Sequence, residues 1–227
     1  RLDDNQPRIQ PVKKQKPAPP PPPKPNKKPE AQAIWDRSQP ANHEIASYLI
    51  GRGITNPPGI FRFSHEKMVA QVVDASGGFL GIHQTWLGKK QKGMLGSVLG
   101  GSVRLAEPVD GNLGISEGIE DGLSDAQATG LPVWCGLSAS GMAAIQLPEH
   151  VQNVWIFADS DANKTGQKAA EKLAARLHEE GRTAQIVYPT EQPTDGTEPV
   201  KKDFNDLLTQ DPTGQLIRDR LAVATPW

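Results

Sequence analysis

The stretch VQNVWIFADSD, residues 151–161, contains the feature that decides the fold of this chain. A predominantly apolar run over residues 151–158 is followed at once by two aspartates with one serine between them. Such a run is typical of a central strand in a parallel sheet, because that strand is buried on both faces. Residues two apart in an extended segment point the same way, so we expect Asp159 and Asp161 to face one spot beyond the strand.

Strands and helices alternate on both sides of this stretch. The pattern predicts strands at residues 113–116, 132–137 and 184–188, and helices at residues 118–129, 140–145 and 165–180. An alternation of this kind is typical of an α/β fold. Residues 108–227 are therefore predicted to form a small, doubly wound, Rossmann-like parallel sheet.

Acidic residues stand at several predicted strand ends. Glu117 follows the first strand, and the loop after the last strand ends in KDFND, which contains Asp203 and Asp206. Ligand sites in such sheets lie beyond the carboxyl ends of the strands. Converging carboxylates repel one another, and a hard divalent cation removes that repulsion. We predict a Mg²⁺ (or Mn²⁺) site formed by Glu117, Asp159, Asp161 and Asp203; the alternative for Asp161 and Asp203 is helix N-capping.

Two further choices concern the same region. Glu117 is the preferred catalytic glutamate, Glu120 is its rival one helical turn later, and Asp121 is expected to be solvated. Lys164 and Lys168 flank the Asp-x-Asp turn and are candidates for phosphate contacts, with a solvated helix surface as the alternative.

The segments ISEGIEDGL (residues 115–123), VWIFADSD (154–161) and KDFND (202–206) resemble a TOPRIM domain. This domain is shared by bacterial primases, topoisomerases and some nucleases. Its hallmark is a glutamate after the first strand and an Asp-x-Asp after the third, which correspond here to Glu117, Asp159 and Asp161. The resemblance implies that the aspartates hold Mg²⁺ and that the glutamate assists proton transfer or metal binding.

The sequence upstream predicts a smaller, basic α+β subdomain over residues 31–107. Residues 68–74 and 79–87 read as two strands of a hairpin, and residues 88–101, GKKQKGMLGSVLGG, as a basic glycine-rich loop. Trp86 and His83 are candidates for stacking on a base, with packing inside the hairpin as the alternative. The cations Arg62, Lys89, Lys90 and Lys92 are expected to contact a nucleic-acid backbone or nucleotides, and the three lysines to contribute little to folding.

The hairpin VVDASGGFLGIHQTWL, residues 72–87, is similar to the one that precedes the TOPRIM fold in primases. Residues 31–210 as a whole resemble the TOPRIM primases of phages, plasmids and integrated elements, which are related to bacterial primases of the DnaG type. The resemblance implies metal-dependent synthesis of short RNA primers on single-stranded DNA from NTPs. It also implies a replicative helicase or an upstream zinc-binding module as a partner. The alternatives are a TOPRIM-type nuclease and a non-catalytic DNA-binding replication module.

Residues 1–30 have a different composition from the rest of the chain. They contain ten of the 21 prolines, including an unbroken run at residues 19–23, with lysines between them. Such a segment has no apolar surface to bury, so it is predicted to be a disordered, extended linker.

The net charge of −1 conceals +9 over residues 1–106 and −10 over residues 107–227. This asymmetry suggests a polyanion bound on one side and metal cations on the other.

Other features exclude several classes of protein. The single cysteine, Cys135, is incompatible with a disulfide framework or a Cys-based zinc site, so no zinc is expected in this chain. No run of 18 apolar residues and no signal peptide are present, which favours a cytoplasmic protein with no membrane partner. The sequence begins at Arg1 instead of a methionine, so we expect it to be part of a longer protein.

Overall fold

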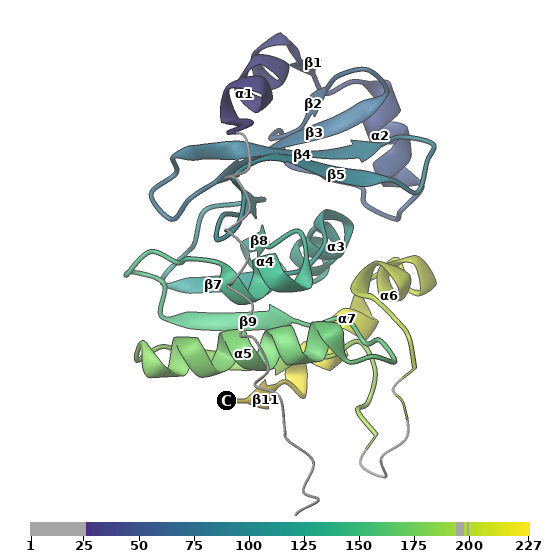
Figure 1. Ribbon diagram of the computed structural model, residues 1–227. Helices are drawn as coiled ribbons and strands as arrows, with labels where there is room; N and C mark the ends of the chain where they lie inside the picture. The colour runs from purple at the N-terminus through teal and green to yellow at the C-terminus, as the bar shows by residue number, and fades with distance from the viewer. Residues whose placement is uncertain (1–25, 194–197, 199) are drawn as a thin grey trace, which may run out of the picture.

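The computed structural model describes residues 26–193, 198 and 200–227 (Figure 1). A five-stranded antiparallel sheet forms the N-terminal part, and a six-stranded mixed sheet with helices on both faces forms the C-terminal part. Residues 1–25, which make up most of the predicted linker, lie outside the described residues.

The C-terminal sheet confirms the predicted α/β fold. Its strand order is β11-β10-β9-β7-β8-β6, in which the four central strands are parallel and the two edge strands antiparallel. The strands are β6 (Val103–Arg104), β7 (Asn112–Ser116), β8 (Val133–Cys135), β9 (Asn153–Phe157), β10 (Thr183–Val187) and β11 (Thr225–Pro226). After β7, the next strand along the chain, β8, lies on one side of it. The chain then crosses to the other side of β7, where β9 and β10 follow. The strand order therefore reverses between β7 and β9.

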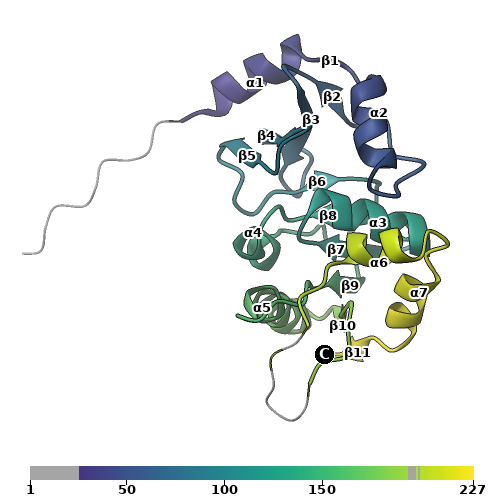
Figure 2. The same cartoon turned by 90° about the vertical axis from the view of Figure 1, so that its right-hand side faces the viewer.

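Helices cover both faces of this sheet, as Figure 2 shows. On one face, α4 (Ala139–Ala144) and α5 (Thr165–Glu179) share a core with the central strands, to which α5 contributes Leu173 and Leu177. The other face is covered by α3 (Ile119–Thr129), α6 (Phe204–Gln210) and α7 (Gln215–Ala222). Apolar residues at helical spacing on α5 therefore account for its position, as the sequence pattern predicts.

The N-terminal sheet has the order β1-β2-β3-β4-β5. Its elements are α1 (Lys28–Arg37), β1 (Gln39–Pro40), α2 (His43–Ile50), β2 (Arg62–Phe63), β3 (Lys67–Val73), β4 (Phe79–Trp86) and β5 (Lys92–Gly96). One face packs on α1 through Val69 and Ile82. On the opposite face, Met68 and Val72 belong to the same core cluster as Ile119 of α3, so this face of the sheet is turned towards the C-terminal part.

Three boundaries differ from the sequence predictions. Helix α1 begins at Lys28, inside the predicted linker. Pro29 does not prevent this, since proline is tolerated in the first turn of a helix. Residues 103–104, assigned from sequence to the N-terminal part, pair with β8 of the C-terminal sheet. Residues 92–96, predicted as part of a loop, form strand β5, which pairs with β4. Two glycines hid the strand pattern in the sequence. A Cβ on Gly93 would lie 3.3 Å from the Trp86 ring, and Gly96 has a φ of 112°.

Within the described part of the chain, no helix combines the length and the apolar character needed to cross a membrane.

Candidate active site

A cavity of about 260 Å³ lies at the point where the strand order reverses. Ser116 of β7 pairs with Phe157 of β9, so the carboxyl ends of these neighbouring strands lie level and Glu117 and Asp159 follow them side by side. This position is where ligands bind in doubly wound sheets. The cavity is lined by the carboxylates of Glu117, Asp121, Asp159 and Asp203, and by Lys92 and His83.

A long-range backbone contact brings Asp203 to this cavity. Ser160 and Lys202 form a pair of N–H···O hydrogen bonds, each of 3.0 Å, so the loop that precedes α6 lies against the Asp-x-Asp loop. Asp203 also begins α6 in a capping box: its carboxylate accepts the Asp206 N–H at 2.7 Å, and the Asp206 carboxylate accepts the Asp203 N–H at 3.4 Å. Asp203 therefore combines helix capping with a place in the cavity.

The two aspartates of the Asp-x-Asp sequence have different surroundings. Asp159 lines the cavity, and its Oδ1 is buried with no hydrogen-bond partner among the described residues. Asp161 accepts hydrogen bonds from the N–H groups of Thr165 (2.9 Å) and Gly166 (3.3 Å) at the start of α5. The N-cap position of α5 is Lys164, so Asp161 is not the N-cap residue, but its carboxylate does accept N–H groups of the first turn. The charge of Asp161 acts on the cavity through its effect on Asp159.

Burial and mutual repulsion raise the pKa values of the cavity carboxylates. The pKa of Asp159 rises to about 9, mainly through burial and then through the charges of Asp121, Glu117, Asp203 and Asp161. Burial, followed by the charge of Asp203, raises the pKa of Asp121 to about 7. Burial also raises the pKa of Glu117, although the Ala139 N–H that its carboxylate accepts acts in the opposite direction. The cavity therefore holds more negative charge than it can keep ionised without a cation.

Asp121 is a site residue that the sequence reasoning missed. It was expected to be solvated, but it is only 8% exposed and accepts the N–H of Asn205 at 3.1 Å. Asp125 lies one turn further along α3, is fully buried and accepts a hydrogen bond of 2.5 Å from Ser116 Oγ. The available signal was the four-residue spacing of Asp121 and Asp125, which places both on one side of α3, but this spacing alone does not show that the side is buried.

The donor set suits a hard divalent cation, although the side chains are not closed around one. Across residues 26–193, 198 and 200–227, no three His, Cys, Asp or Glu side chains are arranged to hold a metal ion. The cavity nevertheless offers carboxylate oxygens, which Mg²⁺ and Mn²⁺ prefer, and an unpartnered buried oxygen on Asp159. The chemistry of these residues therefore fits the predicted metal.

Lys92 lines the cavity and forms an ion pair with a buried glutamate, although the lysine side chain itself is half exposed. Its Nζ lies 2.6 Å from Glu120, which is 4% exposed and also accepts a hydrogen bond of 2.6 Å from the Tyr48 hydroxyl. Burial alone would raise the pKa of Glu120, but the charge of Lys92 and these hydrogen bonds outweigh it and lower the pKa. Glu120, the rival of Glu117, is thus paired with Lys92. Lys92 lies in strand β5 and not in a loop, so we now predict that it contributes to folding.

Replacing Lys92 with methionine is expected to destabilise the protein by about 1–3 kcal/mol, because the buried Glu120 carboxylate loses its charged partner. The double variant K92M/E120Q should recover most of this loss, since a neutral amide needs no counter-charge. Urea unfolding of the single and double variants measures both effects. Equal stability of K92M and the unchanged protein would show that the ion pair makes no net contribution.

The other predicted cations lie outside the cavity. Arg62 stacks on the Trp35 ring at 4.5 Å and donates to the Trp35 carbonyl, so it is engaged in packing. Lys89 and Lys90 are exposed in the β4–β5 turn, and Lys168 is exposed on α5. Trp86 packs under Lys67 at 4.5 Å, in agreement with its alternative role inside the hairpin.

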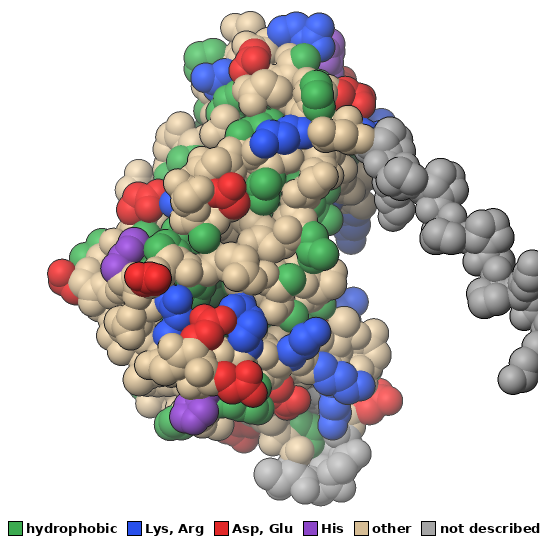
Figure 3. All heavy atoms as spheres, turned by 60° about the vertical axis from the view of Figure 1, so that its left-hand side comes forward, with side chains coloured by type: hydrophobic (Ala, Val, Ile, Leu, Met, Phe, Trp, Pro, Cys, Tyr) green, Lys and Arg blue, Asp and Glu red, His purple; other side chains and the backbone are tan. Residues whose placement is uncertain are grey.

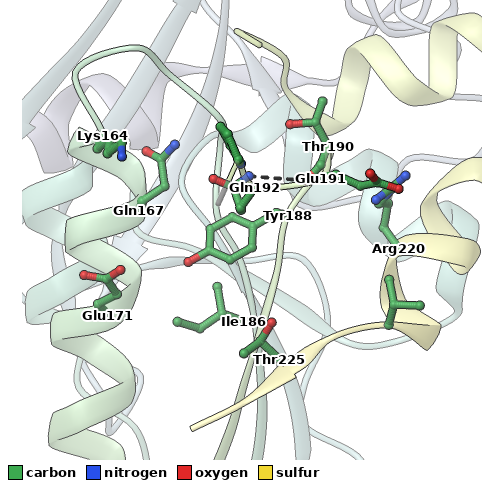
Figure 4. A pocket seen from close by; sticks show the side chains of 12 residues that line it. Lys164, Gln167, Glu171, Ile186, Tyr188, Thr190, Glu191, Gln192, Arg220 and Thr225 are labelled. Carbon is green, nitrogen blue, oxygen red and sulfur yellow. Dashed lines mark hydrogen bonds between the residues drawn. The ribbon is translucent and has the colours of Figure 1, made fainter. Parts of the chain in front are cut away.

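Lys164 lies at a second, separate cavity of about 540 Å³. Figure 4 shows it at the start of α5, above Gln167, with the Tyr188 ring opposite. Lys164 has a φ of 57° and precedes the first turn of the helix. Its predicted phosphate contact would therefore occur away from Lys92 and the four cavity carboxylates.

Comparison with known proteins agrees with this architecture. Residues 112–213 match the Toprim domain family, and residues 25–105 match a domain of unknown function, DUF7146. The fold resembles a DNA primase domain from Pseudomonas aeruginosa, with 17% identity over 88% of this chain and 79% of that one and a TM-score of 0.55.

The DnaG catalytic core is similar at 17% identity, covering 88% of this chain and 78% of that one, with a TM-score of 0.54. A third similar chain comes from a structure of the bacteriophage T7 lagging-strand DNA polymerase with primase domains. It is 18% identical, the match covers 74% of this chain and 83% of that one, and the TM-score is 0.51. No protein with a curated description matches the sequence. Residues 112–213 therefore form a Toprim domain, and the fold of the chain is similar to that of primase cores.

Proposed function

We propose that this Toprim-domain chain, with the fold of DnaG-type primase cores, is the catalytic core of a DNA primase that makes short RNA primers on single-stranded DNA. The observation that carries the proposal is the cavity between β7 and β9. It gathers Glu117, Asp121, Asp159 and Asp203 beside the cation Lys92. Carboxylates for a divalent cation and a lysine for phosphate are the groups that nucleotidyl transfer requires.

Each group has a role in this proposal. Asp159, Asp121 and Asp203 would hold the divalent cation, which supplies charge neutralisation at phosphate oxygens when bound. Lys92, kept in place by Glu120, presents its ammonium group to the phosphates of the nucleotide. Glu117, whose pKa is raised by burial, accepts the proton of the attacking 3′-hydroxyl.

The test supplies the purified chain with labelled NTPs, single-stranded DNA and Mg²⁺ or Mn²⁺, and follows synthesis and degradation in one reaction. Metal-dependent appearance of short RNA products is the expected result. Shortening of the DNA without synthesis would instead identify a nuclease that uses the same carboxylates. DNA binding with neither reaction would identify a non-catalytic module and overturn the proposal.

Lys89 and Lys90 are expected to bind the template. On the face seen in Figure 3, Lys and Arg side chains alternate with Asp and Glu over the C-terminal part, so that face offers no continuous basic surface. The two lysines, by contrast, are exposed in the β4–β5 turn, on the strand pair that leads to Lys92. The double variant K89A/K90A should bind single-stranded DNA more weakly, and the slope of log affinity against log salt should fall by about 1.4.

A matched control is K164A/K168A, which removes two lysines from α5. That variant should keep the salt slope, and both variants should unfold within about 0.5 kcal/mol of the unchanged protein. A slope that falls only in the α5 variant would place the template over α5.

A further inference from the structure

Asn205 hydrogen-bonds to three separate parts of the chain. It is the second residue of α6 and is only 4% exposed. Its backbone N–H donates to Asp121 Oδ1 of α3 at 3.1 Å. Its side-chain Nδ2 donates to Ser124 Oγ of α3 at 3.0 Å and, at 2.8 Å, to the backbone carbonyl of Arg52 in the loop after α2. One residue thus connects α6 with α3 and with the N-terminal part.

The surroundings of this side chain require an amide. Nδ2 meets two acceptors, the Arg52 carbonyl and Ser124 Oγ, whose own proton is donated to the Glu120 carbonyl at 2.8 Å. Asn205 Oδ1 in turn accepts a hydrogen bond of 3.5 Å from Arg52 Nη1. Alanine would leave these buried groups without their partner, and an aspartate would have no donor for the two acceptors.

These hydrogen bonds fix how α6 lies on α3, as the two helices lie against each other in Figure 2. Apolar packing between the helices includes Leu123 and Leu207, but such packing is not directional. Asp203 is the N-cap residue of α6, two positions before Asn205, so its place in the cavity depends on the position of this helix. Asn205 therefore sets where Asp203 stands relative to Asp121 of α3.

The two carboxylates need to be held, because they repel each other. After burial, the charge of Asp203 is the main cause of the raised pKa of Asp121. This repulsion acts to separate α6 from α3 when no cation is bound, and the contacts of Asn205 oppose it. A cation binds more tightly to ligands that the protein already holds in place than to ligands that it must first bring together.

We propose that Asn205 is a positioning residue of the metal site, which holds α6 on α3 so that Asp121 and Asp203 can bind one divalent cation. Asn205 does not itself line the cavity, so it acts through these carboxylates. The inference rests on the metal site of the proposed function and is independent of whether the reaction is RNA synthesis. Residues that orient metal ligands in this way commonly change metal affinity by about 10–100-fold when they are replaced.

The experiment measures the dissociation constant of Mn²⁺, added to the full chain without nucleotide or DNA and followed by the paramagnetic resonance of the free ion. Urea unfolding of each variant is measured beside it. N205A should weaken Mn²⁺ binding by about tenfold. If N205A does not unfold cooperatively, S124A decides instead, since it removes one of the same contacts and should weaken binding by about threefold.

Two further variants separate positioning from a general loss of stability. Asn153 joins neighbouring strands at the opposite ends of the sheet, where it bonds Asn112 at 3.1 Å and Thr183 at 2.8 Å. N153A should therefore lower stability and leave Mn²⁺ binding unchanged. D203N keeps an N-cap but loses the charge, so it should weaken binding, and adding N205A to it should cost less than N205A alone costs.

Unchanged Mn²⁺ binding in folded N205A, with weakened binding in D203N, would overturn the inference and leave the metal site standing. Equal weakening in N153A and N205A, or full additivity of N205A and D203N, would also overturn it. Absence of Mn²⁺ binding to the unchanged chain would overturn both the inference and the metal site. Weaker binding in N205A, in a chain that makes no primers, would support the inference and overturn the proposed function.

Discussion

Replacing Asp159 with asparagine is expected to reduce metal-dependent primer synthesis by about 10³-fold or more, while the metal-free protein stays folded. Asp159 is the carboxylate on which the charges of Asp121, Glu117, Asp203 and Asp161 all act, and its buried Oδ1 has no partner in the part of the chain that the structure describes. Asparagine keeps the shape of the side chain but cannot bind a cation with a charged oxygen. The measurement is kcat for primer synthesis at saturating NTP and Mg²⁺, beside a thermal melt of each protein.

The same variant has a predicted signature in the pH dependence of stability. The pKa of Asp159 is about 9 in the folded protein, above about 3.9 for an unfolded chain, so the folded state retains a proton that the unfolded state releases. The stability contributed by this proton is complete below about pH 4 and is lost as pH rises through 9. The metal-free protein should therefore lose stability between pH 5 and 9, and D159N should lose less.

Added Mg²⁺ should reverse this trend in the unchanged chain. Because binding needs ionised carboxylates, the rise in melting temperature with Mg²⁺ should grow as pH increases, and D159N should lack it. Asp219, an exposed residue of α7, provides the control D219N, which should behave like the unchanged protein in all three assays. A D159N protein with normal activity would exclude this cavity as the catalytic centre.

Replacing Glu117 with glutamine is expected to lower kcat by at least about 10²-fold, the scale of general acid–base assistance. Glutamine preserves the size of the side chain and removes the proton acceptor at the end of β7. Glu117 lines the cavity and is half-buried, and its pKa is raised, so it accepts a proton more readily than an ordinary carboxylate. Mg²⁺-dependent stabilisation should be measured on the same variant, because its survival would separate loss of the base from loss of the metal.

The comparison with Glu120→Gln distinguishes the two neighbouring glutamates. Glu120 holds Lys92 and Tyr48 and does not line the cavity, so E120Q should act mainly by releasing Lys92. We therefore expect a raised KM for NTP and a smaller loss of kcat than in E117Q. Normal activity of E117Q with a large loss of kcat in E120Q would show that Glu120 is the catalytic glutamate.

Much of the fold follows from local patterns. The strand before the Asp-x-Asp, the amphipathic helix α5 and the alternation around them were all predictable, because each depends on periodicity and on glycine or capping residues within a few positions. β5 was not predictable, because glycines occupy the positions where it approaches β4 closely. The segment forms a strand because its backbone hydrogen-bonds to β4, and not because its residues favour a strand.

The candidate site divides in a similar way. Glu117 and Asp159 could be chosen from sequence, because a carboxylate directly after a buried parallel strand must lie at the ligand-binding edge of the sheet. Asp121 could not, since its burial depends on α6, whose Asn205 N–H it accepts from 84 residues away. The sequence predicted that Asp121 would be exposed to solvent, whereas the packing of α6 on α3 buries it.

The sequence by itself determined the α/β class, the central alternation of strands and helices, and the acidic residues that follow the strands, because these depend on local spacing. Only the tertiary structure decided what those residues meet. It placed Lys92 on the buried Glu120, Asp203 against the Asp-x-Asp loop, and His83 beside the carboxylates. These relations arise because the N-terminal sheet and the loop before α6 converge on one edge of the C-terminal sheet, where burial raises the pKa values of the cavity carboxylates.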